Sequence, residues 1–167
     1  SNTRKSVQLL VIPKENLKMA VLIDNRQKTH PLKMKSIRQT AQVVLNALDC
    51  PDGELSILLV DDSHIAELNS QYLNRSGPTN VIAFPMRTGE FSDLTPDLLG
   101  DVVISMDTTG KEARASGIAL EQRFRELLVH GILHLFGYDH ESNAADARQM
   151  EEKSTQLLAL IAQTDLK

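Results

Sequence analysis

The hydrophobic and polar residues follow two different periods along the chain, which predicts both strands and helices. Short apolar runs bounded by turn residues are typical of strands. The run at 54–61 is apolar over nearly its whole length, which indicates a strand buried on both faces. The runs at 79–86 and 99–106 flank a polar segment with Gly and Pro, so we expect these two strands to pair as neighbours. Two further strands are expected near the start of the chain, at 7–12 and 19–24.

Helical spacing of apolar residues characterises the other segments. In residues 31–50 apolar side chains recur every three or four positions, with Pro31 in the expected first turn. Residues 120–136 are apolar on more than one side, which predicts a largely buried helix that ends at Gly137. Because strands and helices mix without strict alternation, the sequence predicts an α+β fold with a mixed β-sheet packed against helices. Three more helices are expected: 64–74 after an N-cap in Asp61-Asp62-Ser63, 108–117, and 142–163 after an N-cap at Ser142 or Asn143.

The length of the chain, 167 residues, predicts a single domain over 1–167, with Ser1 and Asn2 open to interpretation as a tag remnant. No apolar run approaches the ~20 residues of a membrane span, so no membrane partner is expected. The only cysteine, Cys50, cannot form an intrachain disulfide, and any tightly held metal must use His and carboxylate ligands. Such sparse cysteine usage favours a reducing compartment, so the expected location is cytoplasmic.

Charge is distributed unevenly along the chain. The net charge is −4, yet residues 1–40 carry nine Lys and Arg against two acidic residues, Glu15 and Asp24. Such an asymmetry is typical of a face that binds a polyanion, and equally of solvated lysines around an amphipathic helix. Both interpretations stay open at this point.

Three of the five histidines lie in one stretch, HGILHLFGYDH, at 130–140. His130 and His134 stand at i and i+4 of the predicted helix, about 40° apart around its axis and about 6 Å along it, so both imidazoles lean toward one point. Gly137 lets the chain reverse, and His140 then completes a set of three nitrogens. Three nitrogens with an open fourth position are the ligand set of catalytic zinc, although nickel and cobalt suit it too. The spacing therefore predicts a Zn²⁺ site at the end of a buried helix.

The residue after the first of these histidines separates the stretch from zinc peptidases. The ligand frame H-x-x-x-H-x-x-G-x-x-H is that of the metzincin proteases, which carry their general-base Glu where this chain has Gly131. Glycine inside a helix costs roughly 1 kcal/mol relative to alanine. We therefore expect a reason for it, namely close approach of either a packing element or a substrate. A peptidase without its base is a poor peptidase, so different chemistry is favoured.

The same stretch resembles the HGxLHLxGYDH motif of the YbeY family, bacterial metal-dependent endoribonucleases that mature ribosomal RNA. LNSQYLNRSGPTNVIAFP (68–85) is similar to the family's LNxxYRxKDxPTNVLSFP, and LGDVVIS (99–105) to its LGDIVIS. The motifs fall in the family's order, and the resemblance covers about residues 54–160. It implies a zincin-like α+β domain.

The resemblance also implies a function, namely cleavage of single-stranded RNA in 3′-end maturation of small-subunit ribosomal RNA and in ribosome quality control. The implied partners are ribosomal RNA, the small ribosomal subunit or its proteins, and an assembly GTPase. Two other functions stay open. One is a non-catalytic ribosome-assembly factor with a structural zinc, and the other is a zinc peptidase, which Gly131 disfavours.

One position departs from the family pattern. The family often has a functional arginine directly after the tyrosine of the middle motif, where this chain has Leu73, and the nearest arginine is Arg75. We expect Arg75 to neutralise phosphate charge in its place.

The expected site combines three roles. The metal ligands are His130, His134 and His140, and the catalytic residues are His130, Asp139 and Arg75. Asp139 would orient a ligand or accept a proton, with a cap in the turn as its alternative role. Arg75, Thr79, Asn80 and Tyr138 are expected to bind substrate, although Thr79 and Asn80 are equally suited to the turn before a strand.

Overall fold

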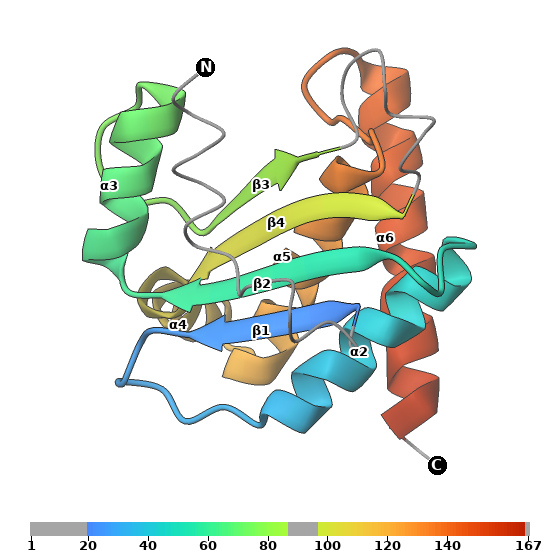
Figure 1. Cartoon of the computed structure of the whole chain (residues 1–167), viewed down its shortest axis with the longest axis horizontal. Helices are drawn as coiled ribbons and strands as arrows, with labels where there is room; N and C mark the ends of the chain where they lie inside the picture. Colours follow the sequence, from blue (N-terminus) through green and yellow to red (C-terminus); the bar gives the residue numbers. More distant parts are fainter. Residues whose placement is uncertain (1–19, 87–96, 166–167) are drawn as a thin grey trace.

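The computed structural model describes residues 20–86 and 97–165. Four strands form one mixed sheet in the order β1-β2-β4-β3. β1, β2 and β4 run parallel, and β3 pairs antiparallel with β4 (Figure 1). The predicted pairing of these two neighbours is confirmed. The strands are β1 (Val21–Asn25), β2 (Glu54–Val60), β3 (Val81–Pro85) and β4 (Leu98–Ser105).

Five helices of the described residues surround the sheet and confirm the predicted α+β class. α5 and α2 cover one face, with α6 packed against both of them, and α3 lies on the other face. Within 20–86 and 97–165, none of the helices combines the length and apolar character that crossing a bilayer requires. The expected strand at 7–12 lies outside the described residues. The helices are α2 (Met34–Ala47), α3 (Asp62–Leu73), α4 (Met106–Ser116), α5 (Leu120–Leu135) and α6 (Ala144–Asp165).

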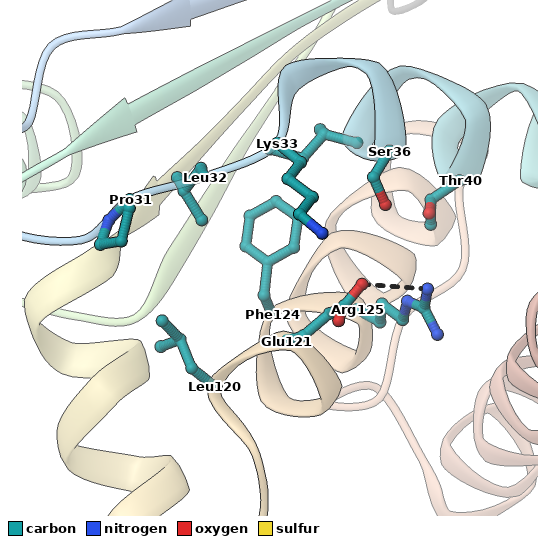
Figure 2. A pocket seen from close by; sticks show the side chains of 10 residues that line it. Pro31, Leu32, Lys33, Ser36, Thr40, Leu120, Glu121, Phe124 and Arg125 are labelled. Atoms are coloured by element: carbon teal, nitrogen blue, oxygen red, sulfur yellow. Dashed lines mark hydrogen bonds and ion pairs between the residues drawn. The ribbon is translucent and has the colours of Figure 1, made fainter.

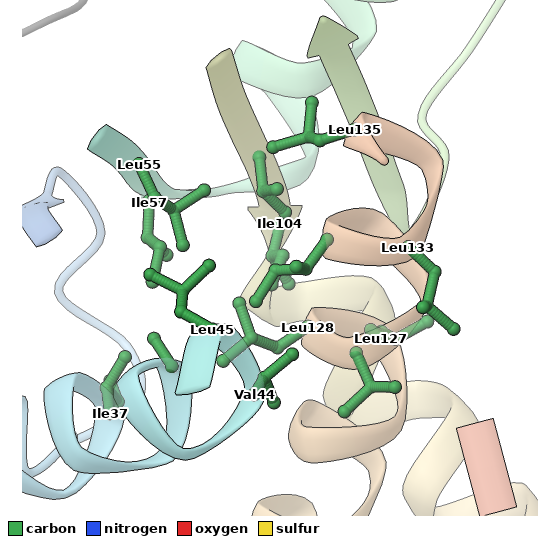
Figure 3. Packing of buried hydrophobic residues seen from close by; sticks show 14 of the residues in the cluster. Ile37, Val44, Leu45, Leu55, Ile57, Ile104, Leu127, Leu128, Leu133 and Leu135 are labelled. Atoms are coloured by element: carbon green, nitrogen blue, oxygen red, sulfur yellow. The ribbon is translucent and has the colours of Figure 1, made fainter. Parts of the chain in front are cut away.

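β2 separates two hydrophobic cores, because its side chains alternate between the faces of the sheet. Leu55, Ile57 and Leu59 point into the main core with α2 and α5 (Figure 3). Leu58 and Val60 point into a smaller core under α3. Burying one such side chain contributes roughly 1.5–3 kcal/mol, and a slip of one residue would exchange the two faces. The predicted burial on both faces is confirmed, and it fixes the register that positions β4.

Two helix starts differ from the predictions. α2 begins at Met34 after Lys33 at the N-cap, so Pro31 lies before the helix instead of in its first turn. α4 begins at Met106, which the sequence assigns to the preceding strand. The reason is that Ser105 is the N-cap of α4, where its hydroxyl accepts a hydrogen bond from the backbone N–H of Thr108 at 3.2 Å.

Two other helices begin at the caps that the sequence offers. The Asp61 carboxylate accepts a hydrogen bond from the backbone N–H of His64 at 2.8 Å, and α3 starts at the next residue. Of the two residues offered for α6, Asn143 is the cap, since its side chain accepts from the backbone N–H of Asp146 at 2.8 Å.

Candidate metal centre

Gly131 allows α5 to pack closely against the sheet. A Cβ at this position would lie 2.6 Å from Cγ1 of Val102 on β4 and 3.2 Å from Cγ2 of Val81 on β3. Interiors as dense as a protein core have no room for an atom at such distances. Of the two reasons expected for this glycine, close approach of a packing element is therefore the one that the structure shows. The same contacts leave no space at 131 for the glutamate of a zinc peptidase.

After the end of α5, the chain reverses its direction and returns toward the last two turns of that helix. Gly137 has φ 91°, a conformation that side chains disfavour, and its N–H donates to the His134 carbonyl at 3.0 Å. The N–H of Tyr138 donates to the Leu133 carbonyl at 3.1 Å. These two bonds form a Schellman motif, which ends the helix and reverses the chain. His140 is thereby returned to the helix, as the sequence predicts.

The three histidines converge on one point. One nitrogen from each of His130, His134 and His140 lies within 4.8 Å of the other two. The Nε2 atoms of His130 and His134 are 3.1 Å apart. Two ligand nitrogens of a tetrahedral zinc ion, each about 2.0–2.1 Å from the metal, are about 3.3 Å apart. The His130–His134 pair therefore already has this spacing, and His140, which is exposed, closes the set from the turn.

Burial keeps the two helical imidazoles in the form that binds metals. Burial, followed by the positive charges of His134, His140 and Arg123, lowers the pKa of His130 from 6.5 to about 4. Burial and then His140 also lower the pKa of His134, against smaller opposing effects of the Asp139 charge, of a hydrogen bond with the Tyr138 backbone and of Glu141. Metals bind neutral imidazole, and a backbone hydrogen bond to the second ring nitrogen is the usual way to orient it. The donor set thus fits a divalent cation.

A charged network beside the histidines was not expected from the sequence. Arg123 lies two turns before His130 on the same face of α5. Its guanidinium pairs with Glu112 of α4 at 3.1 Å and with Glu126 at 2.8 Å. The Asn80 amide donates to both carboxylate oxygens of Glu112, at 3.2 and 3.3 Å. The seven-residue spacing from Arg123 to His130 is a signal that could have identified this arginine.

The other expected site residues divide into two groups. Asn80 joins the network beside His130, and Tyr138 packs against the main core while its backbone bonds His134. In contrast, Arg75 is exposed after α3, and within the described chain neither its side chain nor that of Thr79 makes a hydrogen bond or ion pair. Leu73, at the position of the family arginine, is 41% exposed.

Asp139 has the geometry of a turn residue. Its carboxylate accepts hydrogen bonds from the Glu141 backbone at 2.9 Å and from the Ser142 hydroxyl at 2.7 Å. These two bonds, the backbone one first, lower the pKa of Asp139. A carboxylate stabilised in this way is a weak base, and it holds the turn that carries His140.

Comparison with known proteins places this site in a family. Residues 22–162 match the family model described as Endoribonuclease YbeY. The chain is 49% identical over 144 residues to Endoribonuclease YbeY of Geobacter sulfurreducens, covering 86% of this chain and 96% of that one. It is 38% identical over 135 residues to Endoribonuclease YbeY of Aquifex aeolicus, covering 81% and 88%.

A solved structure agrees with these matches. The solution structure of TM1509 from Thermotoga maritima is similar with a TM-score of 0.61 and 25% identity, covering 84% of this chain and 88% of that one. The matched residues of the family model include the three histidines and all three motifs on which the resemblance rests. The resemblance is confirmed, and the chain belongs to the YbeY family.

Proposed function

We propose that the chain is a metal-dependent endoribonuclease that cuts single-stranded RNA in the 3′-end maturation of small-subunit ribosomal RNA and in ribosome quality control. The observation that carries this proposal is the convergence of His130, His134 and His140 in a member of a family whose relatives are named endoribonucleases. Small-subunit ribosomal RNA is the proposed substrate, and the small subunit or its proteins and an assembly GTPase are the proposed partners.

Zinc is the proposed ion, with nickel and cobalt suited to the same three nitrogens. His130, His134 and His140 would hold it, and its position beside the half-buried α5 face would be reachable by substrate from the exposed His140 side. When bound, such an ion supplies Lewis acidity, which polarises a phosphoryl oxygen and makes water a stronger acid near neutral pH.

Two arginines are suited to the charge of the phosphodiester. Hydrolysis of phosphoryl groups depends mainly on positioning and charge neutralisation. Arg123 lies on the same face of α5 as His130, two turns earlier, and its charge is the smallest of the effects that lower the pKa of His130. Arg75 has a side chain without a charged partner in the described residues and is exposed, so it would contact RNA farther along the strand. We therefore propose that Arg123 neutralises the phosphate that is cleaved and that Arg75 contacts a phosphate farther along the RNA.

The other site residues have supporting roles in this proposal. Asn80 fixes Glu112 and so the direction of Arg123, and the partly exposed Thr79 directly before it would contact substrate. Tyr138 orients His134 through its backbone and offers its ring to the substrate. Asp139 positions His140 through the turn, because its carboxylate accepts hydrogen bonds from the Glu141 backbone and the Ser142 hydroxyl.

The two alternative functions are less well supported. A peptidase would need a base at position 131, where a Cβ would already lie 2.6 Å from Val102. A structural zinc usually has four protein ligands, whereas the cluster offers three among the residues that the structure describes.

The proposal is tested by measuring RNA cleavage and metal content in the same purified sample. We expect one ion per chain and cleavage of a labelled single-stranded RNA, but not of its duplex. The double variant His130→Ala, His134→Ala should lose both properties. His64→Ala removes an imidazole outside the cluster and should keep both. A metal-loaded protein that leaves RNA intact, both free and within small ribosomal subunits, would contradict the proposal.

A further inference from the structure

A pocket of about 240 Å³ lies between the first two turns of α2 and the first two turns of α5 (Figure 2). It is separate from the histidine cluster. The α5 residues that line it include Glu121 and Arg125, which stand roughly half a turn around the helix axis from His130. The pocket therefore opens on the opposite side of α5, and the proposed RNA cleavage makes no use of it.

The start of α2, at one end of this pocket, has neither a side-chain cap nor an acidic residue to balance its partial positive charge. The N-cap is Lys33, which makes no side-chain cap, and the first turn of this 14-residue helix holds no acidic residue. The first N–H groups of a helix lack partners and form the positive end of its dipole, where an anion is favoured. In the part of the chain that is described, the Lys33 ammonium has no ion-pair partner either. A helix start of this kind suits a phosphate.

Thr40 provides independent evidence for a ligand. The residue is 6% exposed and lines the pocket, yet its hydroxyl makes no hydrogen bond with any other residue of the described ranges. Thr109 and Thr155, in comparison, each donate to the carbonyl four residues earlier. Because no fully buried side-chain oxygen or nitrogen of the described residues lacks a partner, the Thr40 hydroxyl must be accessible from the pocket, where a ligand can accept or donate a hydrogen bond. Figure 2 shows the hydroxyls of Ser36 and Thr40 and the ammonium of Lys33 around the same space.

The other side of the pocket is apolar. Leu32, Leu120 and Phe124 form it, next to the ring of Pro31 (Figure 2). The Arg125 guanidinium is already paired with Glu121 at 3.2 Å and Asp165 at 2.6 Å, so Lys33 is the cation left for a ligand among the lining residues. The pocket thus combines an anion-binding end with an apolar wall.

We propose that this pocket binds one nucleotide, with the phosphate at Lys33, Ser36 and Thr40 and the base against Leu32, Leu120 and Phe124. Sites for drug-sized ligands measure roughly 300–1,000 Å³, so this volume suits a single nucleotide with part of it in solvent. A free nucleoside monophosphate and the phosphorylated end of an RNA strand offer the same chemistry. The described residues 20–40 hold five basic residues against one acidic residue, which favours either ligand at the start of α2.

The test measures nucleotide binding by calorimetry on the His130→Ala, His134→Ala variant, so that neither metal nor RNA cleavage contributes. A nucleoside 5′-monophosphate should bind at least about tenfold more tightly than inorganic phosphate or the unphosphorylated nucleoside. Lys33→Ala should weaken binding about tenfold and Thr40→Val about three- to tenfold, since each removes a donor to the phosphate. Lys35→Ala, an exposed lysine of α2 outside the pocket, is the matched control and should change binding less than twofold.

Thr40→Val also separates binding from folding. Valine has the shape of threonine without the unpaired hydroxyl, so the melting temperature of the free protein should stay equal or rise. A 5′-phosphorylated RNA oligonucleotide that binds as tightly as the mononucleotide identifies an RNA end as the ligand, and weaker binding identifies the free nucleotide. Equal affinity for inorganic phosphate and the monophosphate, or equal losses in Lys33→Ala and Lys35→Ala, would overturn the proposal. Failure of RNA cleavage at the histidines would leave this result unchanged.

Discussion

The Asp62 cluster, at the carboxyl ends of β2 and β4, and the histidine cluster, at the end of α5, both gather groups that can bind metals or do acid–base chemistry. Asp62 accepts hydrogen bonds from Ser105 at 2.6 Å, Thr108 at 2.5 Å and Lys111 at 2.8 Å. The histidines instead have each other as neighbours, with ring centroids 4.6 to 5.3 Å apart. The members of the first cluster hydrogen-bond one another, whereas the second directs three ring nitrogens toward one point.

The pKa shifts of the two clusters are both large but have different causes. Burial alone would raise the pKa of Asp62, yet hydrogen bonds from Lys111, Ser105 and Thr108 outweigh it and hold the value at about 2. Burial and neighbouring positive charges lower the pKa of His130 to about 4. A strong shift therefore does not identify a ligand site by itself. What distinguishes the sites is the group that dominates around the shifted one: hydrogen-bond donors that stabilise the charged form of Asp62, and burial with like positive charges at His130.

The contrast between the two clusters depends most on the histidines being required for metal binding. His134→Ala should reduce the metal content from one ion per chain to nearly none and RNA cleavage by on the order of 100-fold or more, because two imidazoles rarely hold zinc. Elemental analysis and a cleavage assay check this. The metal-free variant should be as stable as metal-free wild type within about 1 kcal/mol, since the ring is only half-buried. Full metal content would show that His134 is not a ligand.

Arg123 shares features with both clusters. It forms ion pairs with Glu112 and Glu126, as Asp62 does with Lys111, and it lies on the same face of α5 as His130. Arg123→Gln should lower kcat for RNA about tenfold or more with metal content unchanged, since a charge aimed at the phosphate is lost. Steady-state kinetics at several salt concentrations check this, because a phosphate contact also reduces the salt dependence of RNA binding. Arg114→Gln, an exposed arginine of α4, is the matched control. A lower melting temperature with unchanged kinetics would make Arg123 purely structural.

The Asp62 cluster should respond to mutation through stability and not through activity. The folded pKa of about 2 lies below the ordinary 3.8, so the charged carboxylate stabilises the fold above pH 3.8 and this stabilisation is lost as the pH falls toward 2. Asp62→Asn should lower the free energy of unfolding by about 1–2 kcal/mol at pH 7, after allowance for solvent screening, and the difference from wild type should shrink below pH 4. Urea unfolding between pH 3 and 7 checks this.

Asp52→Asn, at an exposed turn before β2, is the matched control for this series and should change the free energy of unfolding by less than about 0.5 kcal/mol. Metal content and RNA cleavage should stay at wild-type values in both variants. Loss of metal in Asp62→Asn would contradict the view that this cluster acts through stability alone.

Local sequence patterns predict the parts of the fold and site that depend on nearby residues. The two-sided burial of β2, the i,i+4 histidines of α5 and the turn at Gly137 each depend on side chains within a few positions. The strand order β1-β2-β4-β3 was not predicted, because the pairing of β2 with β4 joins segments more than 40 residues apart. The sequence does not decide the reason for Gly131 either, since that reason is contact with Val102 on another element.

The features that the sequence analysis missed also divide into those that depend on nearby residues and those that depend on contacts between distant segments. The position of Arg123 on the face of His130 could be read from helical spacing, but its ion pair with Glu112 depends on how α4 packs against α5. The pocket between α2 and α5 brings Thr40 next to Phe124, more than 80 residues later. Sequence periodicity shows which side of each helix is buried and does not show which helix will cover it.

The smallest expected effect concerns Leu73, at the position of the family arginine. Leu73→Arg should lower KM for RNA by about two- to fivefold through one added cation and leave kcat nearly unchanged, because Arg123 already acts on the site. The side chain is 41% exposed, and its neighbour Tyr72 packs edge-on against Phe84 at 5.8 Å, so stability should be unaffected. Leu73→Gln controls for polarity without charge. If Leu73→Arg raised kcat tenfold, or restored kcat to Arg123→Gln, the position would face the reacting phosphate.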